Sequence, residues 1–203
     1  LNRVLGINRG DVYNQELLQT NLQYNEGGYD ISSIYMDDGY LFFNVDPVEV
    51  RVENDSIDLE IRIYEGDQAT IGKVSVKGNT KTNAHVVVRE MYTKPGQLFS
   101  RSDVIRTTRE LAALGYFNAE TLNPEIKPDP TDGTVDIEYV VEETSSDQIE
   151  LSAGWGYNKL ILTLGLTLNN FSFKNMFKKG AWTPIPGGDG QKLSLRVQTY
   201  GRQ

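Results

Sequence analysis

The sequence contains no cysteine and a single histidine, His85. The absence of cysteine excludes a disulfide framework, a thiol nucleophile and every metal site that depends on thiolate ligands. No run of about 18 apolar residues occurs, so the sequence predicts no transmembrane helix. The chain opens at Leu1 without a signal peptide, and we expect it to be a segment of a longer protein. A charged fraction of 24% over 203 residues nevertheless predicts folded structure.

Charge is divided unevenly along the chain. Residues 1–149 contain 13 basic and 26 acidic residues, a net charge of -13, whereas residues 150–203 contain 7 basic and 2 acidic residues, a net charge of +5. A surface that neutralises nucleic-acid phosphates must be basic. The acidic first part therefore argues against nucleic acid as a partner.

The first part of the chain contains an internal repeat of about 76 residues. Gly39-Tyr40 recurs as Gly115-Tyr116, and the alternating apolar and charged residues 59–63 recur as residues 135–139. Such alternation predicts β-strands. The first copy has several additional residues around Gly27 and lacks the opening strand, because Leu1 aligns near the end of a helix. The pattern predicts two similar modules in tandem.

The complete second copy predicts the order strand, helix, helix, strand, strand. The first strand covers residues 71–76, and the helix after it has an apolar face formed by Ala84, Val87, Val88 and Met91. Ser100 and Asp103 have the spacing of a capping box, which predicts the start of the second helix. Strands over residues 120–127 and 134–143 complete the module, with a turn between them.

Proline marks one strand of each copy as an edge strand. Pro47 and Pro124 fall in the fourth element of their copies, and proline donates no hydrogen bond to a sheet ladder. The sequence therefore predicts open edges along residues 48–52 and 121–126, which can accept a further strand. Plain sheet structure without a binding role explains the same pattern equally well.

After Thr144 the sequence changes to longer strands with one apolar face and one polar or glycine face. Leucine occupies every second position from 160 to 168, and residues 193–199 repeat the alternation. Strands of about 9–11 residues with this pattern are typical of a transmembrane β-barrel. Aromatic residues gather beside the strand ends, as at a membrane interface: Phe171, Phe173, Phe177 and Trp182.

A soluble antiparallel sheet with one buried face is the alternative to a barrel. Five leucines in register on one strand exceed what such a sheet usually needs, so the barrel interpretation is favoured. Three strands do not close a barrel, which needs about eight. The interpretation therefore requires that the protein continue past Gln203.

No group of residues predicts catalysis, a metal site or a cofactor site. His85 has no carboxylate at metal-ligand spacing, and a position on a helix surface accounts for it. The carboxylate pair Asp37-Asp38 is best explained by a helix end, and Asp129 with Asp132 by a turn. The glycine-rich residues 186–190 predict a flexible hairpin loop between the second and third C-terminal strands. We expect a protein that is not an enzyme.

The second copy resembles a POTRA domain. The resemblance rests on residues 74–79, on Arg89-Glu90-Met91 in the first helix, on residues 95–99 between the helices and on residues 114–117. POTRA repeats that lead into Gly154-Trp155-Gly156-Tyr157 and alternating strands are similar to the BamA-type outer-membrane assembly proteins. The resemblance implies an α+β fold of tandem β-α-α-β-β units followed by antiparallel barrel strands. Its parts are a truncated penultimate POTRA unit over residues 1–66, the last POTRA unit over residues 67–144 and the first three strands of an outer-membrane β-barrel over residues 148–203.

The resemblance also implies a function without catalysis or cofactors. That function is the folding and insertion of β-barrel proteins in the outer membrane of a diderm bacterium, with the POTRA units in the periplasm. The implied partners are unfolded outer-membrane proteins, accessory assembly lipoproteins and outer-membrane lipid.

Three groups of residues receive roles by this resemblance. Clients pair by β-augmentation with POTRA edges, here at Val48, Val50, Val52, Leu122 and Ile126. The first barrel strand is a gate edge that templates a client strand, here Ile149, Leu151, Ala153, Trp155 and Tyr157. The residues that the resemblance implies for docking of lipoproteins are Arg89 and Glu90. Solvated helix charges explain this pair better. Pro95 also stands where some members of the family have an acidic docking residue.

Two other functions are weaker alternatives. A POTRA-barrel transporter that secretes one dedicated partner has the same fold, and the number of POTRA units and the plug or lid of the barrel distinguish it. A soluble periplasmic binding or scaffold module forms an ordinary sheet from residues 148–203. Detergent dependence of the longer protein distinguishes that module.

Overall fold

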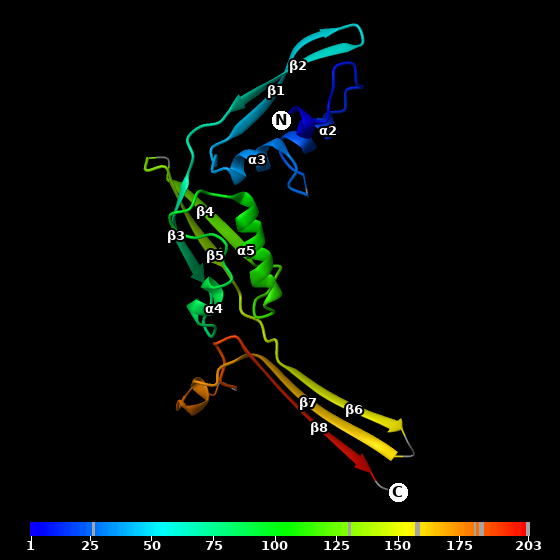
Figure 1. Ribbon diagram of the computed structural model, residues 1–203, viewed down its shortest axis with the longest axis vertical. Coiled ribbons are helices and arrows are strands. Elements are labelled where there is room, and N and C mark those ends of the chain that lie inside the picture. Colours follow the sequence, from blue (N-terminus) through cyan, green and yellow to red (C-terminus); the bar gives the residue numbers. More distant parts are fainter. Residues whose placement is uncertain (26, 130, 157–158, 181, 183–184, 202–203) are drawn as a thin grey trace. The chain divides into compact units, whose positions relative to one another are not determined.

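The computed structural model describes residues 1–25, 27–129, 131–156, 159–180, 182 and 185–201 (Figure 1). The chain forms two compact units. The first contains residues 1–75, 92–107 and 124–138, and the second contains residues 76–91, 108–123 and 139–203. In the described part of the chain, no helix has the length and apolar character needed to span a membrane.

The first repeat consists of three helices and one β-hairpin. The helices are α1 (Asn2–Leu5), α2 (Gln15–Leu22) and α3 (Ile31–Asp37), and the antiparallel hairpin is formed by β1 (Asn44–Glu53) and β2 (Ser56–Tyr64). The core of the repeat contains five buried residues: Leu18, Leu22, Ile31, Phe43 and Val45. Helix and hairpin thus bury one shared apolar layer, as the alternating pattern of the hairpin predicts.

The additional residues of the first repeat separate α2 from α3. The buried carboxylate of Asp30 accepts hydrogen bonds from the backbone N–H of Asn25 (3.0 Å) and of Ser33 (2.8 Å), so it closes the inserted turn and caps α3. Ser32 Oγ donates to the carbonyl of Leu22 at the end of α2 (2.8 Å). The insertion is therefore a hydrogen-bonded interruption between two helices.

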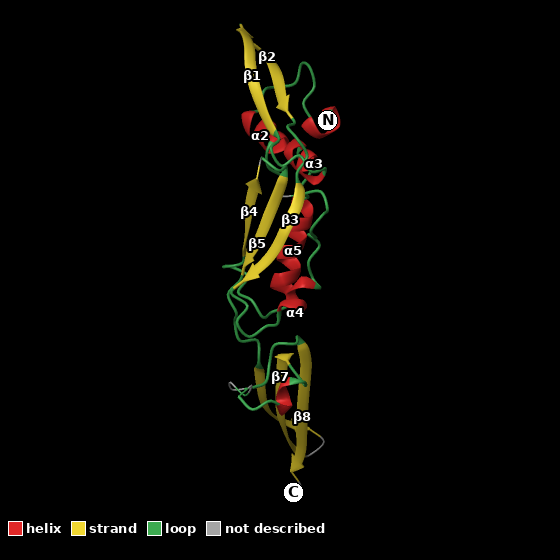
Figure 2. Cartoon of the chain, turned by 90° about the vertical axis from the view of Figure 1, so that its left-hand side faces the viewer, coloured by secondary structure: helices red, strands yellow, loops and turns green. Residues whose placement is uncertain are grey.

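The second repeat has the predicted order of elements. Strand β3 (Thr70–Lys77) is followed by helices α4 (Ala84–Val88) and α5 (Arg101–Ala113) and by strands β4 (Asn123–Asp129) and β5 (Thr134–Val140). The sheet order β3-β5-β4 places β4 at an edge, and α5 lies along one face of this sheet (Figure 2). The strand that contains Pro124 is thus an edge strand, as predicted.

Two details of the second repeat differ from the prediction. Helix α4 ends at Val88, so Val86 and Val87 are buried while Val88 is exposed. A helix of 5 residues makes little more than one turn. An apolar pattern with a spacing of four residues therefore does not determine which side of this helix is buried. Strand β4 begins at Asn123, three residues later than expected.

A capped helix start joins the two repeats within the first unit. Asp37, the last residue of α3, accepts hydrogen bonds from the backbone N–H of Ser102 (2.7 Å) and from Ser100 Oγ (3.1 Å), and Ser102 Oγ donates to its other oxygen. The first N–H groups of a helix have no partner inside the helix. A carboxylate from the first repeat therefore satisfies the start of α5, which confirms a helix-end role for Asp37.

The three C-terminal strands form an antiparallel sheet of their own. Its strands are β6 (Gln148–Gly156), β7 (Lys159–Phe171) and β8 (Gln191–Gly201), in the order β6-β7-β8, and a short 3-10 helix, η1 (Asn175–Phe177), lies between β7 and β8. The register is continuous from Ile149 to Gly156, opposite Leu166 to Lys159. Among the described residues the three strands do not close into a barrel.

Candidate functional site

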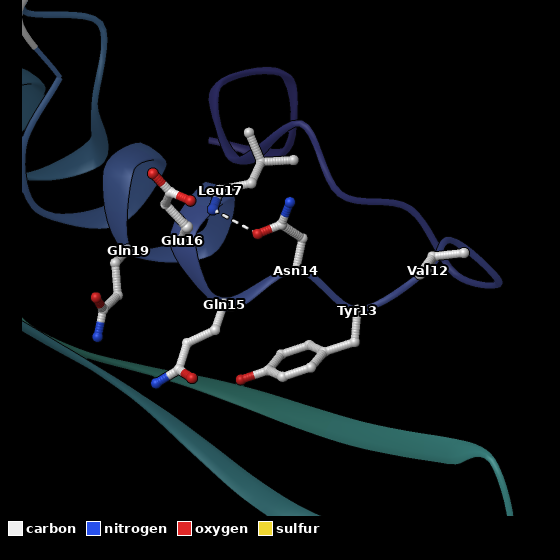
Figure 3. A pocket seen from close by; sticks show the side chains of 7 residues that line it. All are labelled: Val12, Tyr13, Asn14, Gln15, Glu16, Leu17 and Gln19. Carbon is white, nitrogen blue, oxygen red and sulfur yellow. Dashed lines mark hydrogen bonds between the residues drawn. The ribbon is translucent and has the colours of Figure 1, made fainter.

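The first candidate site is the edge strand β1 with the groove beside it. Helix α2 and β1 line a cavity of about 300 Å³, in which Leu18 and Leu22 come from the helix and Pro47 and Glu49 from the strand. A larger open hollow of about 800 Å³ follows the start of α2. There Asn14 Oδ1 caps the helix by accepting from the N–H of Leu17 (3.1 Å), and Tyr13 and Gln15 point toward the hairpin strands (Figure 3). A cavity lined by polar and apolar side chains thus lies between α2 and β1.

The predicted client-binding residues of β1 have unequal surroundings. Val48 is half-buried, whereas Val50 and Val52 are exposed. The pairing with β2 shifts between Glu49 and Arg51, which makes Val50 the extra residue of a β-bulge. A bulge interrupts a ladder and limits uncontrolled pairing at an edge. An added strand that pairs regularly with β1 therefore has to pair either with the residues before Val50 or with those after it.

The second predicted edge is β4. Ile126 lies within the strand and is exposed, but Leu122 precedes the strand and is buried. Lys127 is held by Glu138 of β5 (2.7 Å) and by Glu125 (3.1 Å). A lysine on an edge strand is a common protection against aggregation. The structure leaves Ile126 available at this edge and places Leu122 in the protein interior.

The C-terminal sheet separates apolar from polar side chains. Leu151, Leu164 and Val197 lie opposite one another on the three strands, and Leu151 is 80% and Val197 65% exposed. The other predicted gate residues of β6 that the structure describes, Ile149, Ala153 and Trp155, are also exposed, and Tyr157 lies outside the described residues. Soluble proteins seldom expose contiguous apolar surface of this kind.

Polar groups occupy the opposite face of this sheet. Glu150 lies opposite Gly165, which lies opposite Arg196, and Arg196 Nη2 is 2.7 Å from Glu150 Oε2. The ion pair thus crosses the middle strand at a residue without a side chain. The two faces of β6 to β8 therefore have opposite chemical character, as the alternation predicts.

Strand β6 is an edge strand. It pairs with β7 along one side, and no other strand of the described part of the chain pairs with its second side. Half of its backbone donors and acceptors thus face away from the sheet. Such a row is a ready template for another strand.

Arg89 and Glu90, the predicted docking pair, contact each other. Arg89 Nε lies 2.7 Å from Glu90 Oε1, and the arginine side chain is half exposed. Exposed pairs of this kind contribute little to stability. The arrangement is that of solvated charges after α4, and a docking role for them stays a prediction.

The glycine-rich loop at residues 186–190 is bound to the second repeat inside the second unit. The backbone N–H of Asn83 donates to the carbonyl of Gly188 (2.9 Å), and Asn83 Nδ2 donates to Asp189 Oδ1 (2.7 Å). Asn170 accepts from the N–H of Gly188 (2.8 Å) and of Gly190 (2.9 Å). The loop lies between the antiparallel strands β7 and β8, as predicted, and hydrogen bonds tie its backbone on both sides.

Two carboxylates stabilise this region. Ser172 Oγ donates to Asp189 and holds its pKa below the ordinary value, against the effect of burial and with help from Asn83. Burial tends to raise the pKa of Glu143, but hydrogen bonds from Thr80 Oγ1 (2.6 Å) and from the N–H of Thr82 (2.6 Å) and Lys81 (2.8 Å) lower it overall. Both groups are therefore charged when the loops are in place.

The described residues contain no cluster of three or more histidine, cysteine or acidic side chains suited to a metal ion. His85 Nε2 lies 3.9 Å from Asp189 Oδ1 on the exposed side of α4. The sequence did not suggest this contact or the loop docking, since both join residues more than 100 positions apart. Three glycines in five residues, which permit close backbone approach, were the available signal.

Comparison with known proteins identifies the family. The family model described as "POTRA: Surface antigen variable number repeat" matches residues 1–66 and 69–144. The protein named outer membrane protein assembly factor BamA of Neorickettsia risticii is 29% identical over 75% of this chain and 20% of its own length. The protein of the same name from Neisseria meningitidis serogroup B is 28% identical over 65% of this chain and 17% of its own length. The chain spans about a fifth of the length of these relatives.

Solved structures show the same fold. BamA from Haemophilus ducreyi lacking POTRA domains 1–3 matches with a TM-score of 0.74 and 22% identity, over 97% of this chain and 33% of that chain. POTRA domains 3–5 of BamA from Haemophilus influenzae match with a TM-score of 0.59 and 20% identity, over 70% and 54%. The predicted resemblance to outer membrane protein assembly factors is confirmed. Because the matched residues make up most of its length, the chain belongs to the POTRA family.

Proposed function

We propose that the chain is part of a factor that assembles β-barrel proteins in the outer membrane of a diderm bacterium, with its POTRA units in the periplasm. The observation that carries the proposal is a sheet, β6 to β8, with an exposed apolar face, a polar face and an open edge. The sheet follows two POTRA repeats in the chain. Relatives named as outer membrane protein assembly factors support the same assignment.

The apolar face supports a position in lipid. Exposed apolar surface costs about 25 cal/mol per Å² in water, and Leu151, Leu164 and Val197 all carry this cost. Burial of the face against hydrocarbon removes the cost. The ladder from β6 to β8 leaves only its two outer edges unpaired, and a closed barrel pairs such edges. We therefore propose that residues 148–203 are the first strands of a transmembrane barrel.

The open edges support binding of unfolded clients. A client strand that pairs with β1 gains main-chain hydrogen bonds, which do not depend on its sequence. The cavity between α2 and β1 is large enough for a client side chain, and successive side chains of a strand point to opposite faces. Val48, Val50, Val52 and Ile126 are the proposed contact residues, whereas buried Leu122 takes no part through its side chain.

Strand β6 is proposed as the edge that templates insertion. Its exposed apolar residues point to the side that would face lipid, and its unpaired backbone can continue the sheet with a client strand. Ile149, Leu151, Ala153 and Trp155 thus present the same alternation that a barrel client carries. Accessory lipoproteins are proposed partners of the second repeat, with Arg89 and Glu90 at the contact.

Depletion of the full-length protein, followed by quantitation of the outer-membrane proteome, tests this function. Loss of many unrelated barrel proteins is the expected result. Loss of a single secreted substrate with other barrels intact contradicts it in favour of a dedicated transporter. Unchanged barrels and secretion contradict any role in assembly.

A further inference from the structure

The connection between β7 and β8 carries an unusual group of exposed side chains. Phe173, Phe177 and Trp182 are between 58% and 73% exposed, although each is large and apolar. Between them lie three exposed lysines: Lys174, Lys178 and Lys179. We call residues 173–179 together with Trp182 the basic-aromatic loop.

Internal contacts hold this loop in shape. The rings of Phe173 and Phe177 meet edge to face with centroids 5.4 Å apart. Trp182 Nε1 donates to the carbonyl of Met176 (3.1 Å), and Asn175 Nδ2 donates to the carbonyl of Gly187 (3.0 Å). Exposure of the rings is thus a property of a hydrogen-bonded structure around η1. Rings fixed in this way lose little conformational freedom when they bind.

The loop is strongly positive. No acidic residue occurs from position 151 to position 188 of the sequence. In the part of the chain that the structure describes, none of the three lysines forms an ion pair. Asp189, the acidic residue that follows, is already bonded to Ser172 and Asn83. The charge of Lys174 helps to lower the pKa of Asp189, and without an ion pair the lysines remain available for an external anion.

The loop begins where the apolar ladder ends. Leucine alternates along β7 as far as Leu168, the pairing with β8 shifts between Leu168 and Phe171, and Phe173 follows directly. Aromatic rings and lysines at the end of a lipid-facing strand lie at the depth of the headgroups. Both the chemistry and the place in the chain thus match a membrane interface.

We propose that the basic-aromatic loop binds the phosphate-bearing headgroups of the lipid bilayer, with its rings inserted at the interface and its lysines on the phosphates. The inference rests on the proposed function, because the strands must lie in the membrane for the loop to reach its surface. Such an anchor holds the β7–β8 connection against the leaflet while the loop at residues 186–190 stays bound to the second repeat. A basic residue near an anionic surface contributes about a fivefold gain in partitioning.

The two tryptophans of the chain provide separate readouts. Trp155 lies on β6 and Trp182 in the loop, and the sequence has 2 tryptophans in all. In the 203-residue chain, Trp155→Phe leaves Trp182 to report on the loop, and Trp182→Phe leaves Trp155 to report on the strand. Each is mixed with vesicles of phosphatidylcholine alone or with phosphatidylglycerol added, and with lipids brominated at a shallow or deep position.

The expected result is a blue shift of Trp182 and quenching by shallow bromine, stronger with phosphatidylglycerol. Replacing Lys174, Lys178 and Lys179 by Gln lowers partitioning of the loop by about 100-fold, or fivefold for each lysine. Lys94→Gln, the same change in an exposed lysine of the second repeat, is the control and has no effect.

Trp182 that stays in water on both kinds of vesicle overturns the proposal and leaves the loop to a protein partner. Equal binding of the wild-type and triple-Gln chains to anionic vesicles overturns it as well. Failure of the proposed function is seen separately, because Trp155 then stays in water and escapes quenching by bromine at either depth. Quenched Trp155 with unshifted Trp182 contradicts the loop proposal alone.

Discussion

Arg196 Nη2 lies 2.7 Å from Glu150 Oε2, and the two side chains meet over Gly165 of the strand between them. A Cβ atom at position 165 would come within 3.2 Å of Glu150 Cβ and Oε2. The glycine thus leaves room for a charge pair on the polar face, opposite the face of Leu151 and Leu164. This row of three paired residues reflects both the register of the strands and the different chemistry of the two faces of the sheet.

Gly165→Val is expected to destabilise β6 to β8. The added side chain displaces Glu150 from Arg196 and crowds the face, which costs about 1–3 kcal/mol in a packed site. Unfolding by urea in detergent, followed by the emission of Trp155, measures the change. Glu150→Gln is the control, since an exposed ion pair contributes at most about 1 kcal/mol. Equal effects of the two variants would contradict a steric role for Gly165.

Asp37→Ala is expected to lower the free energy of unfolding by about 0.5–2 kcal/mol, the usual cost of a lost helix cap. The carboxylate satisfies the start of α5 in the next repeat, so the loss affects both repeats together. Circular dichroism during urea unfolding measures it. Asp38→Ala removes the neighbouring exposed carboxylate and should change stability by less than about 0.5 kcal/mol. Similar losses from both variants would show that the cap contributes nothing specific.

Gly188→Ala is expected to release the loop at residues 186–190. Its φ is +115°, and a Cβ there would lie 2.5 Å from the carbonyl oxygen of Lys81. Gly180→Ala is a matched control, because Gly180 has φ +89° but no atom within 4 Å of the added carbon. Hydrogen exchange at the N–H of Asn83, which donates to Gly188, should accelerate in the first variant only. Equal acceleration in both would assign the effect to backbone strain.

Glu143 is expected to make the stability of the second unit depend on pH in the acid range. Because the hydrogen bonds lower the pKa of this carboxyl in the folded state, its stabilisation is complete above the pKa of the unfolded chain and is lost as the pH falls through the folded pKa. Glu143→Gln should therefore lower stability at neutral pH and flatten the fall of stability in acid. Urea midpoints measured from neutral pH into the acid range test this. An unchanged slope in the variant would assign the acid response to other groups.

Sequence patterns predicted the parts of this protein that depend on local chemistry. The alternation in β5 gave its buried residues, and Pro124 gave the edge position of β4, because both signals act within one strand. Contacts between distant polar residues left no such pattern: Ser102 is 65 positions from Asp37, and Asp189 is 106 positions from Asn83. Val86 is buried and the predicted Val88 is exposed. The buried side of α4 depends on the length of this helix, which tertiary packing decides. Candidate edges were thus predictable, and the docked loop was not.

Pairing of a client strand with β6 is the claim on which the proposed mechanism depends most. Residues 1–203 contain no cysteine, so Ser152→Cys introduces a single thiol into this part of the protein, on the polar side of the edge strand. Cysteines are placed in turn along the last strand of an unfolded barrel client, and disulfides are counted during assembly by the full-length protein. Thr163→Cys is the control, because Thr163 of β7 pairs with Ser152 on one side and with Gln198 on the other, so β7 has no free edge at this position.

Disulfides are expected from Ser152→Cys at every second client position, strongest in one register, and none from Thr163→Cys. Absence of disulfides at all positions, or equal yields at neighbouring positions, would contradict templating by this strand.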